Sequence, residues 1–83
     1  PGMTSPTLTI SKGNLVSLHI INEIKNTSEQ KSTHNFNIDE FNVHSKNLGY
    51  FESQSINFLA DKAGQYTYHC TLHPEMKGLL IIQ

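Results

Sequence analysis

Residues 61–78 read DKAGQYTYHCTLHPEMKG, and this stretch decides the fold. A turn with one glycine is followed by a run in which Tyr66, Tyr68 and Cys70 alternate with polar residues. Alternation with a period of two, with aromatic residues on one side, is typical of a strand that has one face against a core. The stretch therefore predicts a strand over residues 65–70 that is entered through a tight turn.

The same alternation recurs along the rest of the chain, while helical periodicity is weak throughout. The final run, Leu79–Gln83, is apolar on both faces, which predicts a strand in the interior of a sheet. Turn signals recur at intervals of roughly 8–12 residues, and this spacing indicates an all-β sandwich or barrel. A polar loop is expected over residues 23–32 and a tight loop over residues 71–77. The expected strands cover residues 7–12, 15–22, 33–38, 51–60, 65–70 and 79–83.

The length of the chain leaves room for one small domain. Its 83 residues are too few for two cores, so we expect a single domain over residues 4–83. Residues 1–3, Pro-Gly-Met, are expected to be a cleavage scar or a disordered start. The single cysteine excludes an internal disulfide as a staple for a domain of this size, whereas a bound metal could serve as one.

The charge balance excludes some classes of partner. The chain has six lysines, no arginine and seven acidic residues, which gives a net charge of −1. A nucleic-acid-binding domain needs a basic surface, usually with arginine, so no nucleic-acid partner is expected. No apolar run approaches the roughly 18–20 residues of a transmembrane helix, so we do not expect this chain to span a membrane.

The segment Cys70–Met76 carries the chemistry. It holds a thiol, an imidazole and a thioether at Cys-x-x-His and His-x-x-Met spacing. A second imidazole, His34, shares the predicted inward face of an earlier strand with Phe36 and Ile38. Two imidazoles, one thiolate and a weak axial thioether are the ligand set of a mononuclear copper site that transfers electrons. These donors suit both oxidation states of copper, and a long axial Met contact favours Cu(I).

On these residues the chain resembles the cupredoxins, the small blue copper proteins with a type 1 site. The matching residues are His34-Asn35-Phe36, the run over residues 61–70 and Lys77-Gly78. The match is good over the C-terminal part of the chain and holds only in outline before it. The Cys-x-x-His-x-x-Met loop is similar to the short ligand loop of amicyanin. The resemblance implies a Greek-key β-sandwich or barrel of six to eight strands, with one copper ion at one end.

The resemblance also implies roles for single residues. Asn35, beside the first ligand, is expected to hydrogen-bond toward Thr71, beside the cysteine, and so to tie the two ligand segments together. The implied copper ligands are three equatorial residues and one axial residue: His34, Cys70, His73 and, in the axial position, Met76.

Three further histidines are expected to lie outside the site. His44 competes with His34 for the place of the first imidazole, but it lies near a predicted turn and lacks the Asn-Phe pair that follows His34. We therefore expect His44 at the surface. His19 and His69 fall on faces opposite the packed residues, so surface or edge positions are expected for both.

The predicted function is one-electron transfer by copper cycling between Cu(I) and Cu(II), without enzymatic turnover, because four ligands leave no open coordination position. One cysteine excludes a binuclear copper centre with two bridging thiolates and a Cys2His2 zinc site. A zinc site with one cysteine and two histidines stays open. Two other functions also stay open. One is a cupredoxin with a weak or open axial site that reacts with a small molecule such as a nitrogen oxide. The other is a copper storage or delivery domain.

Partners and location follow from the resemblance. A redox donor and a redox acceptor are expected to dock near the exposed edge of His73. The expected location is outside the cytoplasm, in the periplasm or on the outer cell surface, either free or tethered through a removed N-terminal segment. The apolar patch around the exposed ligand is expected to come from Leu72 and Pro74, with Leu48 and Tyr50.

Two features depart from the family pattern. Glu75 places a carboxylate inside the ligand loop, which would favour Cu(II) and lower the reduction potential unless the side chain points to solvent. The chain also begins almost at the strand of Leu8 and Ile10, where a cupredoxin usually has one strand more. An unpaired edge strand invites pairing with another molecule, so we expect a monomer with some tendency to dimerise weakly or to exchange strands.

Overall fold

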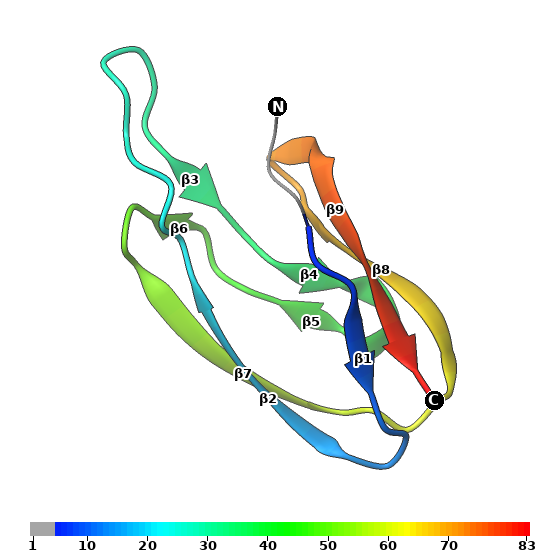
Figure 1. Cartoon of the computed structure of the whole chain (residues 1–83). Coiled ribbons are helices and arrows are strands. Elements are labelled where there is room, and N and C mark those ends of the chain that lie inside the picture. The colour runs from blue at the N-terminus through cyan, green and yellow to red at the C-terminus, as the bar shows by residue number, and fades with distance from the viewer. Residues whose placement is uncertain (1–4) are drawn as a thin grey trace.

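The computed structural model describes residues 5–83, and within this range the fold is all-β with no α-helix (Figure 1). The fold class expected from the sequence is therefore confirmed, while the expectation for residues 1–3 lies outside the described residues. A single 3₁₀ turn, η1 (Asp39–Phe41), interrupts the strands. The strands are β1 (Leu8–Ile10), β2 (Leu15–Ile21), β3 (Thr33–His34), β4 (Asn37–Ile38), β5 (Val43–His44), β6 (Leu48–Gly49), β7 (Ser53–Leu59), β8 (Gly64–Cys70) and β9 (His73–Ile82).

The larger sheet has the strand order β1-β9-β8-β4-β5. β9 runs antiparallel to β8 on one side and parallel to β1 on the other. Because β9 has a neighbour on each side, its apolar residues are covered: Leu80 is 0% exposed and Ile82 is 2% exposed. The predicted interior position of the last strand is confirmed.

β9 starts earlier than the sequence indicated. It begins at His73 rather than at Leu79, so the loop predicted over residues 71–77 shrinks to a two-residue turn, Thr71-Leu72. The pairing with β8 shifts at this point, because His69 pairs with Lys77 while the next residue, Cys70, pairs with His73. A shift of this kind lets a strand accommodate Pro74, a residue that otherwise signals the end of a strand.

The second sheet consists of β2 and β7 in unbroken antiparallel register from Leu15↔Leu59 to Ile21↔Ser53. Its side chains alternate, with Leu18 packed toward the core and His19 exposed. Among the residues that the structure describes, neither strand has a further neighbour in this sheet. The larger sheet thus has interior strands, β9, β8 and β4, whereas β2 and β7 are both edge strands.

The strand predicted over residues 33–38 is two short strands in the structure. β3 pairs with β6, whereas β4 pairs with β5 and β8, so the chain changes sheets between them. At the change, the Phe36 amide donates to Ser45 Oγ at 2.8 Å and the Ser45 amide donates to the Phe36 carbonyl at 2.9 Å. The side-chain alternation continues through the break, and for this reason the sequence did not reveal it.

The core lies between the larger sheet and the β2–β7 sheet. Aromatic rings fill it, with Phe41 packed against Phe58 and Tyr66 at ring-centroid distances of 5.3 and 4.9 Å. Tyr68 lies so close over Gly78 that a Cβ at that position would be 2.3 Å from the tyrosine Cζ atom. The buried members of the core are Ile38, Val43, Phe58, Ala60, Leu80 and Ile82.

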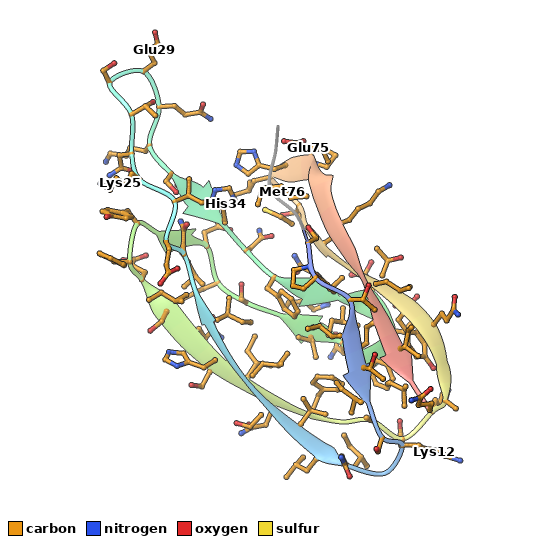
Figure 2. The ribbon with its side chains drawn as sticks, viewed as in Figure 1. Lys12, Lys25, Glu29, His34, Glu75 and Met76 are labelled. Atoms are coloured by element: carbon orange, nitrogen blue, oxygen red, sulfur yellow. The ribbon has the colours of Figure 1, made fainter. Side chains whose placement is uncertain are left out.

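The two ends of the sandwich differ in chemistry (Figure 2). The turn after β1 carries Lys12 at one end, while His34, Glu75 and Met76 gather at the other. A loop projects beyond this second end and is anchored by buried Asn22, whose Nδ2 donates to Ser32 Oγ and to the Leu48 carbonyl, both at 2.9 Å. Within residues 5–83 no helix has the length and apolar character needed to cross a membrane.

Candidate metal site

The larger sheet and the short β3–β6 pair bring the four predicted ligand residues to the same end of the molecule. His34 closes β3, which is held by its pairing with Leu48 of β6. The other three residues lie at the junction of β8 and β9: Cys70 ends β8, His73 begins β9 and pairs with Cys70, and Met76 follows on β9. A two-residue turn therefore sets the spacing between the thiol and the second imidazole.

The two imidazoles face each other. The ring centroids of His34 and His73 are 4.5 Å apart, with an angle of 33° between the ring planes. Nε2 of His73 lies 3.2 Å from the Thr33 carbonyl oxygen. The Nδ1 atom of His34 is buried and has no hydrogen-bond partner, and a buried polar atom in this state needs an explanation, such as an ion that its lone pair would bind.

The electrostatics keep His34 in the form that binds metals. Burial lowers the pKa of His34 below its ordinary value, and the neighbouring His73 lowers it further, while the carboxylate of Glu75 raises it in part. A lowered pKa favours the neutral imidazole, and a neutral imidazole has the free lone pair that a metal requires.

The cysteine is held by the backbone beside His34. Cys70 is 4% exposed, and the amide of Asn35 donates to its Sγ atom at 3.4 Å. The side chain of Asn35 also makes two hydrogen bonds to Thr71: Nδ2 donates to Thr71 Oγ1 at 2.7 Å, and the Thr71 amide donates to Oδ1 at 2.8 Å. Three hydrogen bonds thus clamp the segment after His34 to the segment around Cys70.

The clamp extends further than the sequence suggested. Nδ2 of Asn37 donates to Asn35 Oδ1 at 2.9 Å and to the His69 carbonyl at 3.1 Å. Asn37 is 4% exposed, and its Oδ1 atom lies 2.9 Å from Nδ1 of His44. The sequence held a signal for this residue, because Asn35 and Asn37 have the i, i+2 spacing that places side chains on one face of an extended segment.

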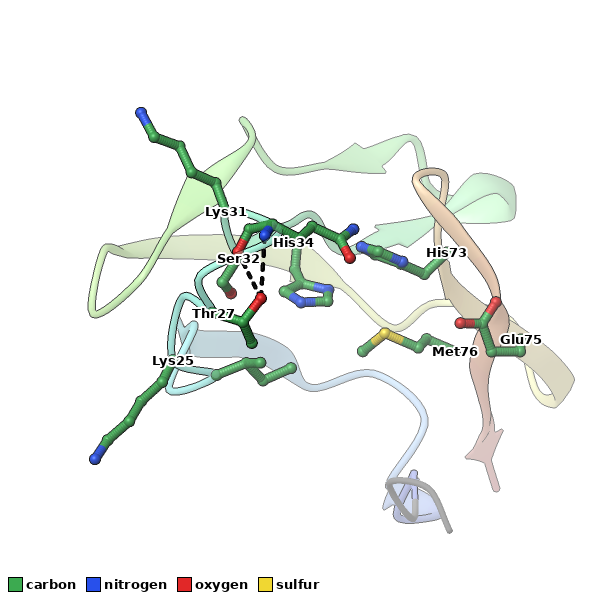
Figure 3. A pocket seen from close by; sticks show the side chains of 10 residues that line it. Lys25, Thr27, Lys31, Ser32, His34, His73, Glu75 and Met76 are labelled. Atoms are coloured by element: carbon green, nitrogen blue, oxygen red, sulfur yellow. Dashed lines mark hydrogen bonds between the residues drawn. The ribbon is translucent and has the colours of Figure 1, made fainter.

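A cavity of about 250 Å³ lies beside the two imidazoles (Figure 3). Met76 and Glu75 reach it from β9, and the loop after β2 forms its other wall. A second cavity of about 220 Å³ adjoins it, and Met76 and His34 line both. The thioether and the unpartnered imidazole therefore border the same space, and Glu75 is an exposed residue at its rim.

Not every expected surface residue lies where it was placed. Leu48 was expected in the apolar docking patch, but it is only 1% exposed because it is packed under the site. Leu72 is 45% exposed and Pro74 is exposed, while Tyr50 is half-buried and stacks on Phe51. The surface patch is therefore smaller than the sequence indicated.

The remaining histidines lie outside the site. His19 and His44 are exposed, as expected. His69 is half-buried at the sheet surface, where its Nε2 atom lies 3.1 Å from a carboxylate oxygen of Asp39.

The donor atoms are of the types that bind copper. Their side chains do not, however, form a complete coordination sphere in this structure. Among residues 5–83, no three side chains of the His, Cys, Asp and Glu types form a group that could hold a metal ion. The thiol, the imidazoles and the thioether nevertheless share one end of the fold, and the orphaned Nδ1 of His34 faces no protein partner. Soft thiolate and thioether donors combined with imidazole suit copper better than magnesium or calcium.

The fold and the donor set together define a small β-sandwich with imidazole, thiol and thioether groups at one end. Residues 2–82 match the model of the cupredoxin-like domain family, and the chain belongs to that family. The comparison with curated proteins found no match.

Several solved structures share this fold. A reduced amicyanin variant is 24% identical, with a TM-score of 0.64 over 95% of this chain and 70% of that chain. Reduced auracyanin from the photosynthetic bacterium Roseiflexus castenholzii is 20% identical, with a TM-score of 0.73 over 93% of this chain and 83% of that chain. The copper nitrite reductase from Nitrosomonas europaea is 21% identical, with a TM-score of 0.76 over 94% of this chain but only 30% of that chain. At these identities the likeness shows the fold.

Proposed function

We propose that this protein is a mononuclear type 1 copper protein that transfers one electron between redox partners. The proposed equatorial ligands are His34, Cys70 and His73, and Met76 is the proposed axial ligand. The observation that carries the proposal is the buried, unpartnered Nδ1 of His34 beside the second imidazole, at the end of a cupredoxin-like domain. The copper ion supplies the chemistry, which is a one-electron change between Cu(I) and Cu(II).

The protein residues hold the donors in place while the charge changes. The hydrogen bonds of Asn35 to Cys70 and Thr71 fix the thiol against the segment that carries His34. The backbone N–H of Asn35 donates a hydrogen bond to Sγ and so fixes the position of the sulfur beside His34. Donors that are held in this way need little rearrangement when an electron arrives or leaves.

The route for the electron is the exposed side of the β8–β9 turn. His73 is half-buried, and exposed Leu72 and Pro74 flank it. Here a redox donor and a redox acceptor would dock, with Glu75 adding a negative charge that favours a partner with a basic surface. The protein itself performs no turnover, and it acts outside the cytoplasm, in the periplasm or at the outer cell surface, free or tethered.

Voltammetry of the copper-loaded protein tests this function. We expect a reversible one-electron couple that survives repeated cycling. A copper storage or delivery domain would instead release Cu(I) to a chelator and would give no reversible couple. The matched control is His19→Gln, which changes an exposed histidine of β2 that lines neither cavity and should leave the couple in place.

A second candidate function, reaction with a small molecule at an open axial position, has one observation in its favour. The cavity of about 250 Å³ reaches His34, His73 and Met76 from outside. Addition of nitrite or nitric oxide to the copper protein would change its visible spectrum if copper were open to that cavity. An unchanged spectrum at saturating nitrite favours electron transfer alone.

A further inference from the structure

The edge of β2 that faces away from β7 is open. Among the described residues β2 pairs with β7 alone, in a register without a break over all seven residues. Natural sheet edges are commonly protected by a proline, a lysine or a bulge. The strand reads LVSLHII and has none of these three protections. Its free side is therefore available to another strand.

The ladder with β7 shows which backbone groups face the open side. The Asn22 amide donates to the Glu52 carbonyl at 3.0 Å, and the Ala60 amide donates to the Asn14 carbonyl at 2.9 Å. In an antiparallel ladder, residues bonded to the partner alternate with residues whose groups point away. The even-numbered residues of β2 therefore bond to β7. The amides and carbonyls that face the open side belong to Leu15, Ser17, His19 and Ile21.

The apolar side chains of β2 are also incompletely covered. Val16, Leu18 and Ile20 belong to the inner face, yet all three are only half-buried. On the outer face, Leu15 is 73% exposed and Ile21 is 45% exposed. A further strand along this edge would cover both rows, because the side chains of neighbouring strands lie beside each other on each face.

We propose that the open edge of β2 pairs with the same edge of a second copy of this chain, antiparallel about a two-fold axis at Leu18. In this register Leu15 lies opposite the partner's Ile21, and Ser17 lies opposite the partner's His19. These are the residues whose backbone groups face the edge, so each such pair exchanges two hydrogen bonds. The two exposed apolar residues, Leu15 and Ile21, then cover each other.

The inner face matches equally well. Val16 lies opposite the partner's Ile20, and Leu18 lies opposite the partner's Leu18. The apolar row of one molecule thus continues into the other, and a four-stranded sheet β7-β2-β2-β7 spans the dimer. Two-fold pairing is the commonest symmetry of protein dimers and requires a self-complementary surface of this kind.

The open edge of β7 provides the contrast that singles out β2. A similar two-fold pairing of β7 about Ile56 would place Ser53 opposite the partner's Leu59 and Gln54 opposite the partner's Phe58. Both pairs join a polar residue to a large apolar one. The sequence of β2 is self-complementary about its centre, and the sequence of β7 is not.

A proline at the edge tests the proposal. Ser17→Pro removes an amide that faces the open side of β2, and Ser55→Pro removes the corresponding outward amide of β7. Both substitutions leave the bonds between β2 and β7 in place. In sedimentation equilibrium of the copper-loaded protein we expect a wild-type dimer. Ser17→Pro should weaken it by more than about tenfold, since each substitution acts on both halves of a two-fold interface, and Ser55→Pro should not.

A disulfide trap keeps the test decisive if Ser17→Pro does not fold. Residues opposite each other without hydrogen bonds in an antiparallel pair have Cα atoms about 4.5 Å apart, within the range of a disulfide. Leu18→Cys should therefore form a covalent dimer under mild oxidation, linked through residue 18 in peptide mapping. Ile56→Cys, its neighbour on β7, should stay monomeric.

Three results would overturn the proposal: a wild-type monomer up to millimolar concentration, equal weakening by both prolines, or equal cross-linking of both cysteine variants. A monomer would mean that a strand from outside this chain occupies the edge, or that the edge stays free. None of these results bears on the copper couple, so the proposed function is tested separately.

Discussion

The five-stranded sheet and the β2–β7 sheet bury their apolar residues to different degrees. In β9, which has neighbours on both sides, Leu80 and Ile82 are 0% and 2% exposed. In β2, which has one neighbour, Leu18 of the inner face is only half-buried and Leu15 of the outer face is 73% exposed. The difference shows that this small domain has a closed half and an open half, set by how many strands flank each apolar row.

The candidate site lies on the closed half. Three of its four predicted ligands, Cys70, His73 and Met76, come from β8 and β9, the most extensively paired strands of the larger sheet. Sites on rigid strands hold their geometry better than sites on loops. The open half contributes the cavity wall around the site and the edge that is free for association.

The largest expected effect tests the comparison directly. Leu80→Ala removes a fully buried side chain and should lower the free energy of unfolding by about 3–5 kcal/mol. Leu18→Ala removes a half-buried side chain of the same size and should cost about 1–2 kcal/mol, since less packing is lost. Urea denaturation of the metal-free protein at low concentration measures both. Equal losses would mean that the two sheets are equally closed.

A methyl group in the closed half should also be costly. Gly78→Ala would place a Cβ 2.3 Å from the ring of Tyr68, so the ring or the strand must move. We expect a loss of about 1–3 kcal/mol in the free energy of unfolding. Gly49→Ala is the control, because its Cβ would meet only the flexible carboxylate of Glu52, at 3.3 Å. If thermal unfolding shows that Gly78→Ala lowers the free energy of unfolding no more than the control does, Tyr68 is not packed tightly against Gly78.

The hydrogen bonds of Asn35 to Thr71 should affect the affinity for copper more than the stability of the fold. Asn35→Ala removes both side-chain bonds to Thr71, and we expect copper affinity to fall by about 10- to 100-fold and the potential to shift. Asn47→Ala removes only the 3.0 Å hydrogen bond that Asn35 Nδ2 donates to Asn47 Oδ1 and should have a much smaller effect. Competition with a copper chelator measures the affinity. Similar affinities for the two variants would show that the clamp does not govern the site.

The smallest expected effect concerns Glu75. Its side chain is exposed but lies at the cavity beside His34 and His73, so its charge should stabilise Cu(II). Glu75→Gln should therefore raise the reduction potential by some tens of millivolts at low salt, and added salt should shrink the shift. Glu52→Gln, an exposed acidic residue that does not line this cavity, is the control. No difference between the variants at low salt would place the carboxylate of Glu75 in solvent.

Much of the fold was predictable because the period of two is a local property. The alternation of Tyr66, Tyr68 and Cys70 fixed β8, and the apolar run Leu79–Gln83 indicated an interior strand. The features that the sequence did not reveal depend on which strands pair with each other. The chain changes sheets between β3 and β4 without any change in alternation, and β9 passes Pro74 because its register with β8 shifts there.

The candidate site could be predicted from the spacing of its residues in the sequence, but the surroundings of the site could not. Cys70, His73 and Met76 are close in sequence, so their common location needed only a turn. The burial of Leu48 under the site depends on contacts between distant strands. Such contacts leave little trace in a single sequence, because a buried Leu and an exposed Leu read alike in an alternating pattern.

Titration of the metal-free protein with Cu(II), followed by visible and EPR spectroscopy, tests the central claim most directly. We predict an intense thiolate-to-copper absorption band and a narrow copper hyperfine splitting at one equivalent. Both should be lost in Cys70→Ala and kept in His19→Gln, which changes an exposed histidine of β2 outside both cavities. A weak visible band with a broad hyperfine splitting in the wild type would place copper on surface histidines and would contradict the site formed by His34, Cys70, His73 and Met76.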